Sequence, residues 1–405
     1  MDGSDREGRR TRVALVEDDG LMEIYYGHPS QEKLVGNIYK GRVEDVLPGM
    51  GSAFVDVGEE KSLFLSRGEI STAVLKRRGF RPWKGSTPIQ KILRSKQSLV
   101  LQVRREGIGT KNPQGTTKIS LPGRFLVFLP NEDRLGISRR IENIRTQRNL
   151  RRIARDLKQS GQGLIIRTAA QWASEEDLKR DYRLLHDTWT SIEKAARGSS
   201  APQLLHKAMG LVQTILRDRL LPDTEEVIVD SKFFLEKIYA FLDYMHMEDY
   251  RGRIRLHRGK KPLFEEYGVE SQIREIQSPR VDLRGGGFLV ISETEALTTV
   301  DVNTGANVRH RNQQAAILST NLEAAEEIAR QLRLRQISGI IIVDFVDMSD
   351  SSCETQLVEK IREELRKDRV PADFIDITRL GLVEITRKRE GESLADLLEN
   401  AEFDA

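Results

Sequence analysis

The N-terminal part of the chain alternates apolar and polar positions in short runs that are separated by turn residues. Residues 11–26 read TRVALVEDDGLMEIYY, two β-rich runs around Asp19-Gly20, and this pattern predicts a hairpin. Short runs resume at Asn37, stop at a basic insertion at about 69–95, and return in SLVLQVRR and TTKISL. About five short strands punctuated by Gly and Pro predict a small barrel.

The middle of the chain mixes strand and helix periodicities. Residues 123–170 combine short strands with a basic helix and end in the apolar run LIIRTAA. Helices are expected at about 174–196, where Ser174 precedes two glutamates, and at about 201–219. The run EEVIVD predicts a strand, and residues 231–247 predict a helix.

After about residue 280 the pattern becomes strand, strand, helix, strand, helix and a last pair of strands in DFIDITRLGLVEITRKR. Thr320 and Glu323 match a capping box, which predicts a helix start in STNLEAAEEIARQLRLR. The apolar run ISGIIIVDFVDM is typical of a strand buried on both faces, and residues 353–367 predict an amphipathic helix. Gly285-Gly286-Gly287 lacks the Lys-Ser/Thr of a phosphate-binding loop and predicts a hairpin turn.

The composition is that of an ordinary globular protein. The chain has 405 residues, 38% hydrophobic and 31% charged, and this length indicates about two to four domains. No apolar run approaches the roughly 18–20 residues of a membrane span, and the first residues, MDGSDREGRRTR, are expected to be a loose polar leader rather than a secretory signal. Cys353 is the only cysteine, which excludes intrachain disulfides and cysteine-rich zinc sites and favours a reducing compartment, the cytoplasm.

The net charge is only +3, but positive charge is concentrated in one stretch. Between Ser138 and Lys158, eight basic side chains face only Glu142 and Asp156, a local net charge of +6. This stripe suggests a polyanion as partner, and a merely solvated helix face is the alternative. The last fourteen residues, from Glu392, carry five acids and no base.

Two aspartates are candidate metal ligands. Strand alternation places Asp301 and Asn303 on one face of ALTTVDVN, roughly 7 Å apart. Asp344 ends the run IIIVDF, where an ionised carboxylate is costly unless it is paired or coordinated. Mg²⁺ is commonly held by one or two carboxylates with water and phosphate, so the pair points to a Mg²⁺ site. Asp347 and Glu384 are competing acids, and strand-end aspartates that cap turns are the structural alternative.

The predicted barrel carries candidate nucleic-acid contacts. Phe54 alternates with Ala53 and Val55, and Phe64 follows in SLFLS, so both rings are candidates for stacking on bases near the cations Lys40, Arg105 and Lys111. Core packing of either ring is the alternative. The six histidines are scattered and form no motif, which makes a two-histidine ribonuclease mechanism a poor fit.

Three blocks of sequence resemble the ribonuclease E/G family. TTVDVNTG, TNLEAAEEIARQLRLRQISGIIIVDFVDM and RLGLVEITRKR look like the catalytic core of that family. NIYKGRV, GSAFVDVG and FLS resemble its OB-fold RNA-binding domain, and GLIIRTAA is similar to its sensor for a 5′-monophosphate. The matches are collinear from about Val35 to Arg389. The resemblance thus covers nearly the whole chain.

The resemblance implies a multi-domain α/β and β fold. A ribonuclease H-like subdomain (1–35 and 215–278) would be interrupted by an OB-fold barrel (36–121) and a 5′-sensor region (122–214). A deoxyribonuclease-I-like catalytic subdomain (279–400) would follow. The family's site residues fall here on the Mg²⁺ ligands Asp301 and Asp344, the phosphate-orienting Asn303, the RNA contacts Phe54, Phe64, Lys111 and Arg379, and the 5′-phosphate pocket of Gly123, Val127, Arg167 and Thr168. Arg105 is added to the RNA contacts as a cation of the predicted barrel.

The activity implied is Mg²⁺-dependent hydrolysis of single-stranded RNA, including mRNA and rRNA precursors, with preference for 5′-monophosphorylated substrates and with 5′-phosphate and 3′-hydroxyl products. Two rivals remain. A non-catalytic RNA-binding protein would have no need of a buried acidic pair, and a deoxyribonuclease fits the RNA-type barrel poorly. For Arg167, pairing with Glu175 or Glu176 is the alternative to phosphate binding.

Two departures from the family pattern affect these expectations. Many members continue into a CPxCxGxG-type zinc motif that joins two protomers, whereas here TRKREGESL runs into the acidic tail. We therefore expect no dimer linked by cysteine-ligated zinc, and other homo-oligomers stay open. The segment NVRHRNQQAAILS replaces the acidic stretch often found there, which predicts an altered RNA preference.

Overall fold

The structure is a computed structural model that describes residues 11–17, 20–27, 34–80, 87–107, 111–305, 313–348, 350–389 and 393–394. Several predictions fall outside these residues: the polar leader, the hairpin turn at Asp19, the start of the segment NVRHRNQQAAILS and the acidic tail. The chain forms two compact units, one comprising Met1–His28, Val229–Ser231 and Leu256–Ala405, the other Pro29–Ile228 and Lys232–Arg255. Within the described ranges, no helix is both long and apolar enough to cross a membrane.

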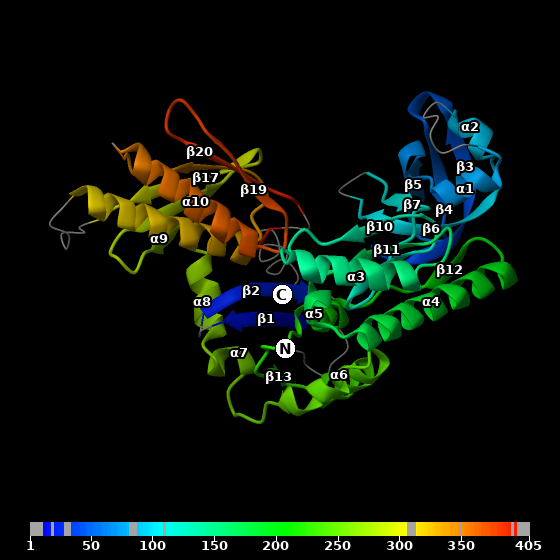
Figure 1. The fold of residues 1–405 in the computed structure, drawn as a ribbon, viewed down its shortest axis with the longest axis horizontal. Coiled ribbons are helices and arrows are strands. Elements are labelled where there is room, and N and C mark those ends of the chain that lie inside the picture. Colours follow the sequence, from blue (N-terminus) through cyan, green and yellow to red (C-terminus); the bar gives the residue numbers. More distant parts are fainter. Residues whose placement is uncertain are drawn as a thin grey trace. The chain divides into compact units, whose positions relative to one another are not determined.

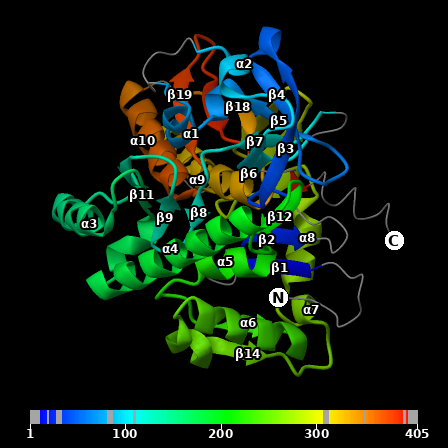
Figure 2. The same ribbon diagram turned by 90° about the vertical axis from the view of Figure 1, so that its right-hand side faces the viewer.

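The second unit contains the predicted barrel (Figure 2). Five strands close on themselves because β3 pairs with both β4 and β6: β3 (Ile38–Leu47), β4 (Ser52–Asp56), β5 (Leu63–Ser66), β6 (Ser98–Arg105) and β7 (Gln114–Thr116). The β5–β7 pair is parallel and the other pairs are antiparallel. Alternate residues such as Val55, Leu65 and Leu101 fill the interior, while their neighbours face outward.

Short elements surround the barrel. They are η1 (Pro48–Met50), η2 (Arg67–Glu69), α1 (Thr72–Arg77) and α2 (Ile89–Ile92), while β12 (Gln203–His206) adds a strand to β3. The helix expected over 201–219 is therefore wrong in its first part. Residues 203–206 hydrogen-bond to a strand distant in sequence, and α5 (Leu211–Arg219) begins only after Gly210.

The next part of this unit is a four-stranded sheet covered by two helices. The strands are β8 (Leu121–Pro122), β9 (Leu126–Leu129), β10 (Leu135–Ile137) and β11 (Gly163–Ile166), in the order β10-β11-β9-β8. Helix α3 (Ile144–Leu157) is capped by Asn143, and α4 (Glu175–Gly198) starts in a capping box formed by Ser174 and Asp177. The 3₁₀ turn η3 (Thr168–Trp172) lies between β11 and α4. Phe128, Leu164 and Trp189 belong to the shared core.

Smaller elements follow α5 along the chain. They are β13 (Val227–Val229), α6 (Lys232–Tyr244), η4 (Glu248–Arg253) and β14 (Ile254–Leu256), and β13 pairs with β14. The predicted strand in EEVIVD and the predicted helix over 231–247 are both confirmed by β13 and α6.

The first unit joins the N-terminal hairpin to residues far along the chain. Strands β1 (Thr11–Glu17) and β2 (Gly20–Gly27) are antiparallel, as predicted. Arg12 forms a 3.0 Å ion pair with Glu270, and the Leu21 amide donates a 2.7 Å hydrogen bond to Gln272. Both partners belong to α8 (Val269–Ile276), which follows α7 (Leu263–Glu266). The hairpin is thus fixed by side chains as well as by its own ladder.

A six-stranded mixed sheet forms the rest of this unit. Its strands are β15 (Arg280–Asp282), β16 (Phe288–Glu293), β17 (Leu297–Asn303), β18 (Gly339–Asp344), β19 (Ala372–Ile377) and β20 (Val383–Arg387), in the order β15-β16-β17-β18-β20-β19. Helices α9 (Gln313–Leu334) and α10 (Ser351–Lys367) lie side by side against it (Figure 1). Core residues of the sheet, such as Val300 and Ile341, pack against Ile328 and Ile361 of these helices.

Two predictions for this sheet are wrong. Strand β18 is not buried on both faces, because Ile341 and Val343 are buried whereas Ile340 is 51% exposed. Helices α9 and α10 cover one face only. Thr320 lies well inside α9 rather than at its start, and Glu323 accepts hydrogen bonds from the Gly285 amide instead of completing a capping box.

Candidate functional site

Asp301 and Asp344 lie next to each other on the open face of the six-stranded sheet. Strands β17 and β18 are parallel neighbours, and their register pairs Asp301 directly with Asp344. Adjacent strands lie about 4.8 Å apart, so the two side chains leave the sheet side by side. Both are exposed, whereas the alternating residues Val300 and Val343 are buried. The structure therefore brings these acids together, but the expectation of a buried acidic pair is wrong, because α9 and α10 pack against the opposite face of the sheet and both aspartates are exposed.

Asn303 shares the face of Asp301, as strand alternation predicts. Its side-chain amide donates a 2.9 Å hydrogen bond to Asp301 Oδ2. One N–H of the amide is used in this way, which leaves a second N–H for another acceptor. The arrangement holds an uncharged donor beside the carboxylate pair.

The competing acids lie nearby but in less direct positions. Glu384 is opposite Ile342 in the β18–β20 register. Ile342 precedes Asp344 by two residues on β18, so Glu384 is on the same face of the sheet as Asp344. Asp347 is exposed in the segment after β18. Within the described residues, none of these four carboxylates forms an ion pair, and no cluster of three or more His, Cys, Asp or Glu is arranged to hold a metal ion. Asp301 and Asp344 can therefore offer a cation two exposed carboxylates, with its other ligands coming from water or substrate.

Arg379 lies in the turn that joins β19 to β20. The turn is closed by the Thr378 amide donating to Leu382 O (2.8 Å), and Gly381 adopts a positive φ of 84° in it. Val343 pairs with Val383 in the β18–β20 register. The turn before β20 therefore lies at the end of the sheet where β18 ends at Asp344. The exposed residue Arg379 thus lies at the same end of the sheet as Asp301 and Asp344.

Phe54 and Phe64 face outward from the barrel. They are direct partners in the β4–β5 register, and their rings meet edge to face with centroids 5.8 Å apart. Neither ring belongs to the barrel core, so the core-packing alternative is wrong for both. Phe64 is paired with Gln114, and Gln114 with Arg105, so aromatic and cationic side chains form one row across the outer surface.

The other two cations of the barrel differ in their surroundings. Lys111 is exposed three residues before Gln114. Lys40, in contrast, donates to the carbonyls of Ala196 (2.7 Å) and Ser199 (2.5 Å) at the C-terminal end of α4. This cation therefore stabilises a helix end and does not belong to the aromatic row.

The four residues assigned to a 5′-phosphate pocket gather around β9 and β11. Arg167 follows β11, and its guanidinium donates to the Gly123 carbonyl at 2.5 Å. Thr168 exchanges a 2.8 Å hydrogen bond with the hydroxyl of Ser138. Val127 is half-buried and is paired with Ile165 of β11. The structure thus places all four within one small region of the four-stranded sheet.

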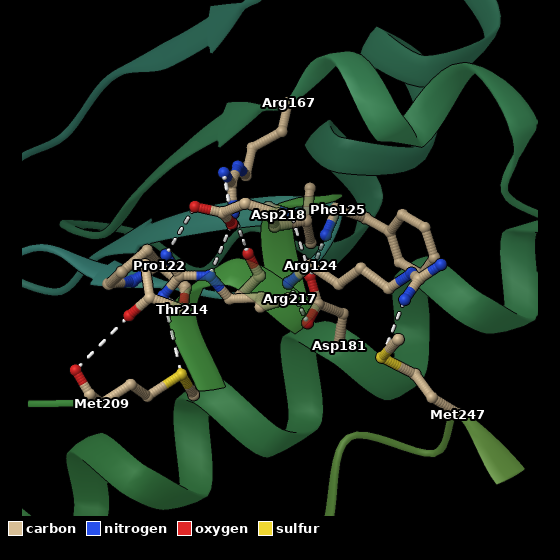
Figure 3. Close-up of polar contacts among 12 residues, drawn as sticks. Pro122, Arg124, Phe125, Arg167, Asp181, Met209, Thr214, Arg217, Asp218 and Met247 are labelled. Carbon is tan, nitrogen blue, oxygen red and sulfur yellow. Dashed lines mark hydrogen bonds and ion pairs between the residues drawn. The ribbon is translucent and has the colours of Figure 1, made fainter. Parts of the chain in front are cut away.

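Arg167 has a partner that the sequence did not suggest. Its second guanidinium nitrogen lies 2.8 Å from Asp218 Oδ1, and Arg217 donates to both oxygens of Asp218 at 2.7 and 2.9 Å. In Figure 3 the two arginines approach this carboxylate from opposite sides. Burial alone would raise the pKa of Asp218, but the two arginines hold it below its ordinary value. The expected alternative partners are wrong, because Glu175 pairs with Arg152 and Lys179, and Glu176 pairs with Lys179.

Asp181 of α4 holds the backbone that follows Gly123 in place. It is buried and accepts hydrogen bonds from three successive backbone amides, those of Arg124 (3.1 Å), Phe125 (2.8 Å) and Leu126 (2.8 Å). Burial raises the pKa of this carboxyl, and the amides act in the opposite direction. A Cβ at Gly123 would lie only 2.4 Å from Asp181 Oδ1, so glycine is required there. An acid among the apolar positions of a helix was the only sequence signal for this role.

Comparison with known proteins finds relatives that match most of the chain. Residues 120–390 match the model of the ribonuclease E/G family. Ribonuclease G of Haemophilus influenzae is 40% identical over 390 residues, which cover 96% of this chain and 79% of the relative. Ribonuclease G of Escherichia coli is 37% identical over 391 residues, 96% of this chain and 80% of the relative. Ribonuclease E of a Nostoc species is 37% identical over 388 residues, 95% of this chain and 55% of the relative.

These relatives define the class as RNA-cleaving hydrolases. The chain belongs to the ribonuclease E/G family and is an endoribonuclease. The family assignment made from the sequence motifs is therefore confirmed. The mixed α/β fold with a closed five-stranded barrel agrees with it.

Proposed function

We propose that this chain is a Mg²⁺-dependent endoribonuclease that cleaves single-stranded RNA, prefers 5′-monophosphorylated substrates, and leaves 5′-phosphate and 3′-hydroxyl ends. The observation that carries the proposal is the direct pairing of Asp301 with Asp344 on two parallel strands, both exposed on an uncovered face. We further propose that it acts on mRNA and rRNA precursors in RNA processing and decay, in the cytoplasm. In this proposal the chain contains a ribonuclease H-like and a deoxyribonuclease-I-like subdomain with the boundaries expected above, and the deoxyribonuclease-I-like subdomain carries the catalysis.

The carboxylate pair fits a divalent cation. Neither Asp301 nor Asp344 has a basic partner among the described residues, so both charges are available to a ligand. Two carboxylates with water and phosphate form the donor set that Mg²⁺ favours. When bound there, Mg²⁺ would supply positive charge to the scissile phosphate and acidify a coordinated water.

The neighbouring residues have their own tasks in this proposal. Asn303 keeps Asp301 in place with one amide N–H and can donate the other to an oxygen of the scissile phosphate. Arg379 is at the same edge of the sheet and adds positive charge for the RNA backbone. Attack of water on phosphorus opposite the 3′ oxygen breaks the bond to that oxygen, which determines the ends of the products.

The row on the barrel supports binding of single strands. A stacking ring needs an unpaired base, and Phe54 and Phe64 present two rings on the outer surface. Arg105 continues the same row through Gln114, so a cation is available for the backbone of the same strand.

The Arg167 pocket supports recognition of a terminal phosphate. A guanidinium can bind two phosphate oxygens with short charge-assisted hydrogen bonds, and Thr168 adds a hydroxyl. A phosphate would have to replace Asp218 on one side of Arg167. Asp218 would stay paired in that exchange, because Arg217 donates to both of its oxygens.

Cleavage of matched RNAs tests the whole proposal. One single-stranded sequence would be prepared with a 5′-monophosphate, a 5′-hydroxyl and a 5′-triphosphate, beside a DNA of the same sequence, and incubated with Mg²⁺ or EDTA. We expect fastest cleavage of the monophosphorylated RNA, none in EDTA, and products that a 5′-phosphate-dependent exonuclease degrades. RNA binding without cleavage would favour the non-catalytic alternative, and cleavage of the DNA would favour a deoxyribonuclease.

A further inference from the structure

Helix α3 presents a row of arginines to solvent. Its inner face packs through Leu150, Ile153 and Ala154 into the core of the four-stranded sheet. The outer face carries a set of exposed arginines that recur every three or four residues, and we call it the arginine face: Arg145, Arg148, Arg151 and Arg155. At 1.5 Å per residue the row is about 15 Å long. These four arginines belong to the basic stretch between Ser138 and Lys158.

The arginine face has no counter-charge of its own. Among the described residues no ion pair is formed by any of its four members. The neighbouring Arg152 is different, since it pairs with Asp156 (3.4 Å) and Glu175 (3.2 Å). Arg145 and Arg148 are also near the N-terminal end of the helix, where the peptide dipoles already disfavour positive charge. Four unpaired arginines so placed repel one another and attract a polyanion.

An exposed aromatic ring lies on the 3₁₀ turn η3, which contacts α3. Trp172 is 58% exposed at the end of η3. Glu175 follows three residues later, and its ion pair with Arg152 joins the start of α4 to the outer side of α3. Tryptophan is rarely left so exposed, and beside arginines it can stack on a base while they bind phosphates.

We propose that the arginine face and Trp172 form a second RNA-binding surface, which holds a single-stranded segment through its phosphates and one stacked base and requires no 5′ end. Single-stranded RNA is favoured over a duplex because only an unpaired base exposes a face to Trp172. The surface uses neither the carboxylate pair nor the Arg167 pocket. It would therefore bind RNA whose 5′ end is blocked, and it stands or fails independently of the 5′-monophosphate preference.

The first test measures binding of a 5′-hydroxyl oligoadenylate in EDTA over a series of salt concentrations. The triple variant Arg148→Gln, Arg151→Gln, Arg155→Gln removes up to three phosphate contacts. For single strands each contact contributes about 0.7 to the slope of log affinity against log salt, so the slope should fall by about 2. The matched triple variant Arg180→Gln, Arg183→Gln, Arg197→Gln changes the same charge on exposed positions of α4 and should keep the wild-type slope. Equal slopes for the two variants would overturn the proposal.

Two further variants and additional RNA substrates test the proposal more closely. Arg→Lys substitution at the same three positions should keep the slope, which shows that charge rather than folding is measured. Trp172→Ala should weaken binding about 5- to 100-fold with little change of slope. Unchanged affinity in Trp172→Ala, or loss of duplex binding with intact single-strand binding in the glutamine variant, would overturn the single-strand assignment. The glutamine variant should keep the wild-type ratio of cleavage rates on 5′-monophosphorylated and 5′-hydroxyl RNA, so failure of this surface is distinct from failure of the 5′ sensor.

Discussion

A guanidinium nitrogen of Arg167 lies 2.8 Å from Asp218 Oδ1, and the chain holds the two residues together although they are 51 positions apart. The ion pair fixes the arginine in the absence of a ligand, so in the proposed 5′-phosphate pocket little side-chain entropy would remain to be lost on binding. It also means that a ligand must compete with a carboxylate. A 5′-hydroxyl carries no charge and cannot compete in this way.

Arg167→Ala should remove most of the preference for 5′-monophosphorylated RNA. Charge-assisted hydrogen bonds contribute roughly 1.5–3 kcal/mol each, which corresponds to about a tenfold to hundredfold preference. The rates on 5′-monophosphorylated and 5′-hydroxyl RNA should become similar, while the rate on 5′-hydroxyl RNA stays near that of wild type. Arg183→Ala, an exposed arginine of α4, is the control. If wild type itself shows equal rates on both RNAs, the sensor hypothesis fails whatever the variant does.

Asp218→Asn should lower the melting temperature at neutral pH but not in acid. The pKa of Asp218 is lowered in the folded state, so its ion pairs stabilise the fold above the ordinary pKa of about 4 and this contribution disappears as the pH falls through the folded pKa. The difference in melting temperature between wild type and variant should therefore shrink as the pH decreases below about 4. Asp223→Asn, at an exposed position, serves as the control. A difference that is constant with pH would contradict the assignment.

Asp301→Ala and Asp344→Ala should each abolish cleavage and leave RNA binding largely intact. Groups that merely support a metal ligand are typically worth about 10- to 100-fold, so loss of a ligand should exceed roughly 2.7 kcal/mol of barrier. Asp373→Ala removes an exposed acid of β19 from the same sheet and should cleave normally. Near wild-type cleavage by either test variant with Mg²⁺ would reject the metal assignment, and Asp347 and Glu384 would then be examined.

Phe54→Ala should weaken RNA binding by roughly 1–3 kcal/mol without a comparable loss of stability. A buried phenylalanine would instead cost about 3–5 kcal/mol of folding free energy, but this ring is outside the barrel core. Melting temperature and RNA affinity would be measured on the same preparation. Tyr244→Ala removes another exposed ring of the same unit and should leave affinity unchanged. A large loss of stability with normal affinity would refute the stacking role.

Gly123→Ala should destabilise the protein by about 1–3 kcal/mol, because the new methyl group would meet Asp181 Oδ1 at 2.4 Å. The buried carboxylate cannot move aside without giving up its amide donors. Gly198→Ala at the end of α4 is the matched control, since nothing lies within 4 Å of a Cβ there. The melting temperatures of both variants would be measured by thermal unfolding. Equal values would show that the backbone at residue 123 can move away from Asp181, which would contradict the prediction.

The sequence predicted the parts of the site that depend on periodicity. Alternation placed Asp301 and Asn303 on one face and turned Phe54 away from the core, and both are as expected. Asp218 and Asp181 escaped prediction because each acts on a segment about 50 residues away, and no local pattern records such contacts. The run of isoleucines in β18 was misread for a related reason. Ile340 is as apolar as Ile341, and only the position of the helices decides which one is covered.

The pairing of Asp301 with Asp344 has a consequence for how such an enzyme can change. The two carboxylates are spaced by the hydrogen bonds between β17 and β18 and not by the 42 residues that separate them in the chain. Residues inserted into or removed from the connection before α9 would therefore leave this spacing as it is. The length of chain between the two strands can therefore change while the geometry of the carboxylates is inherited unchanged.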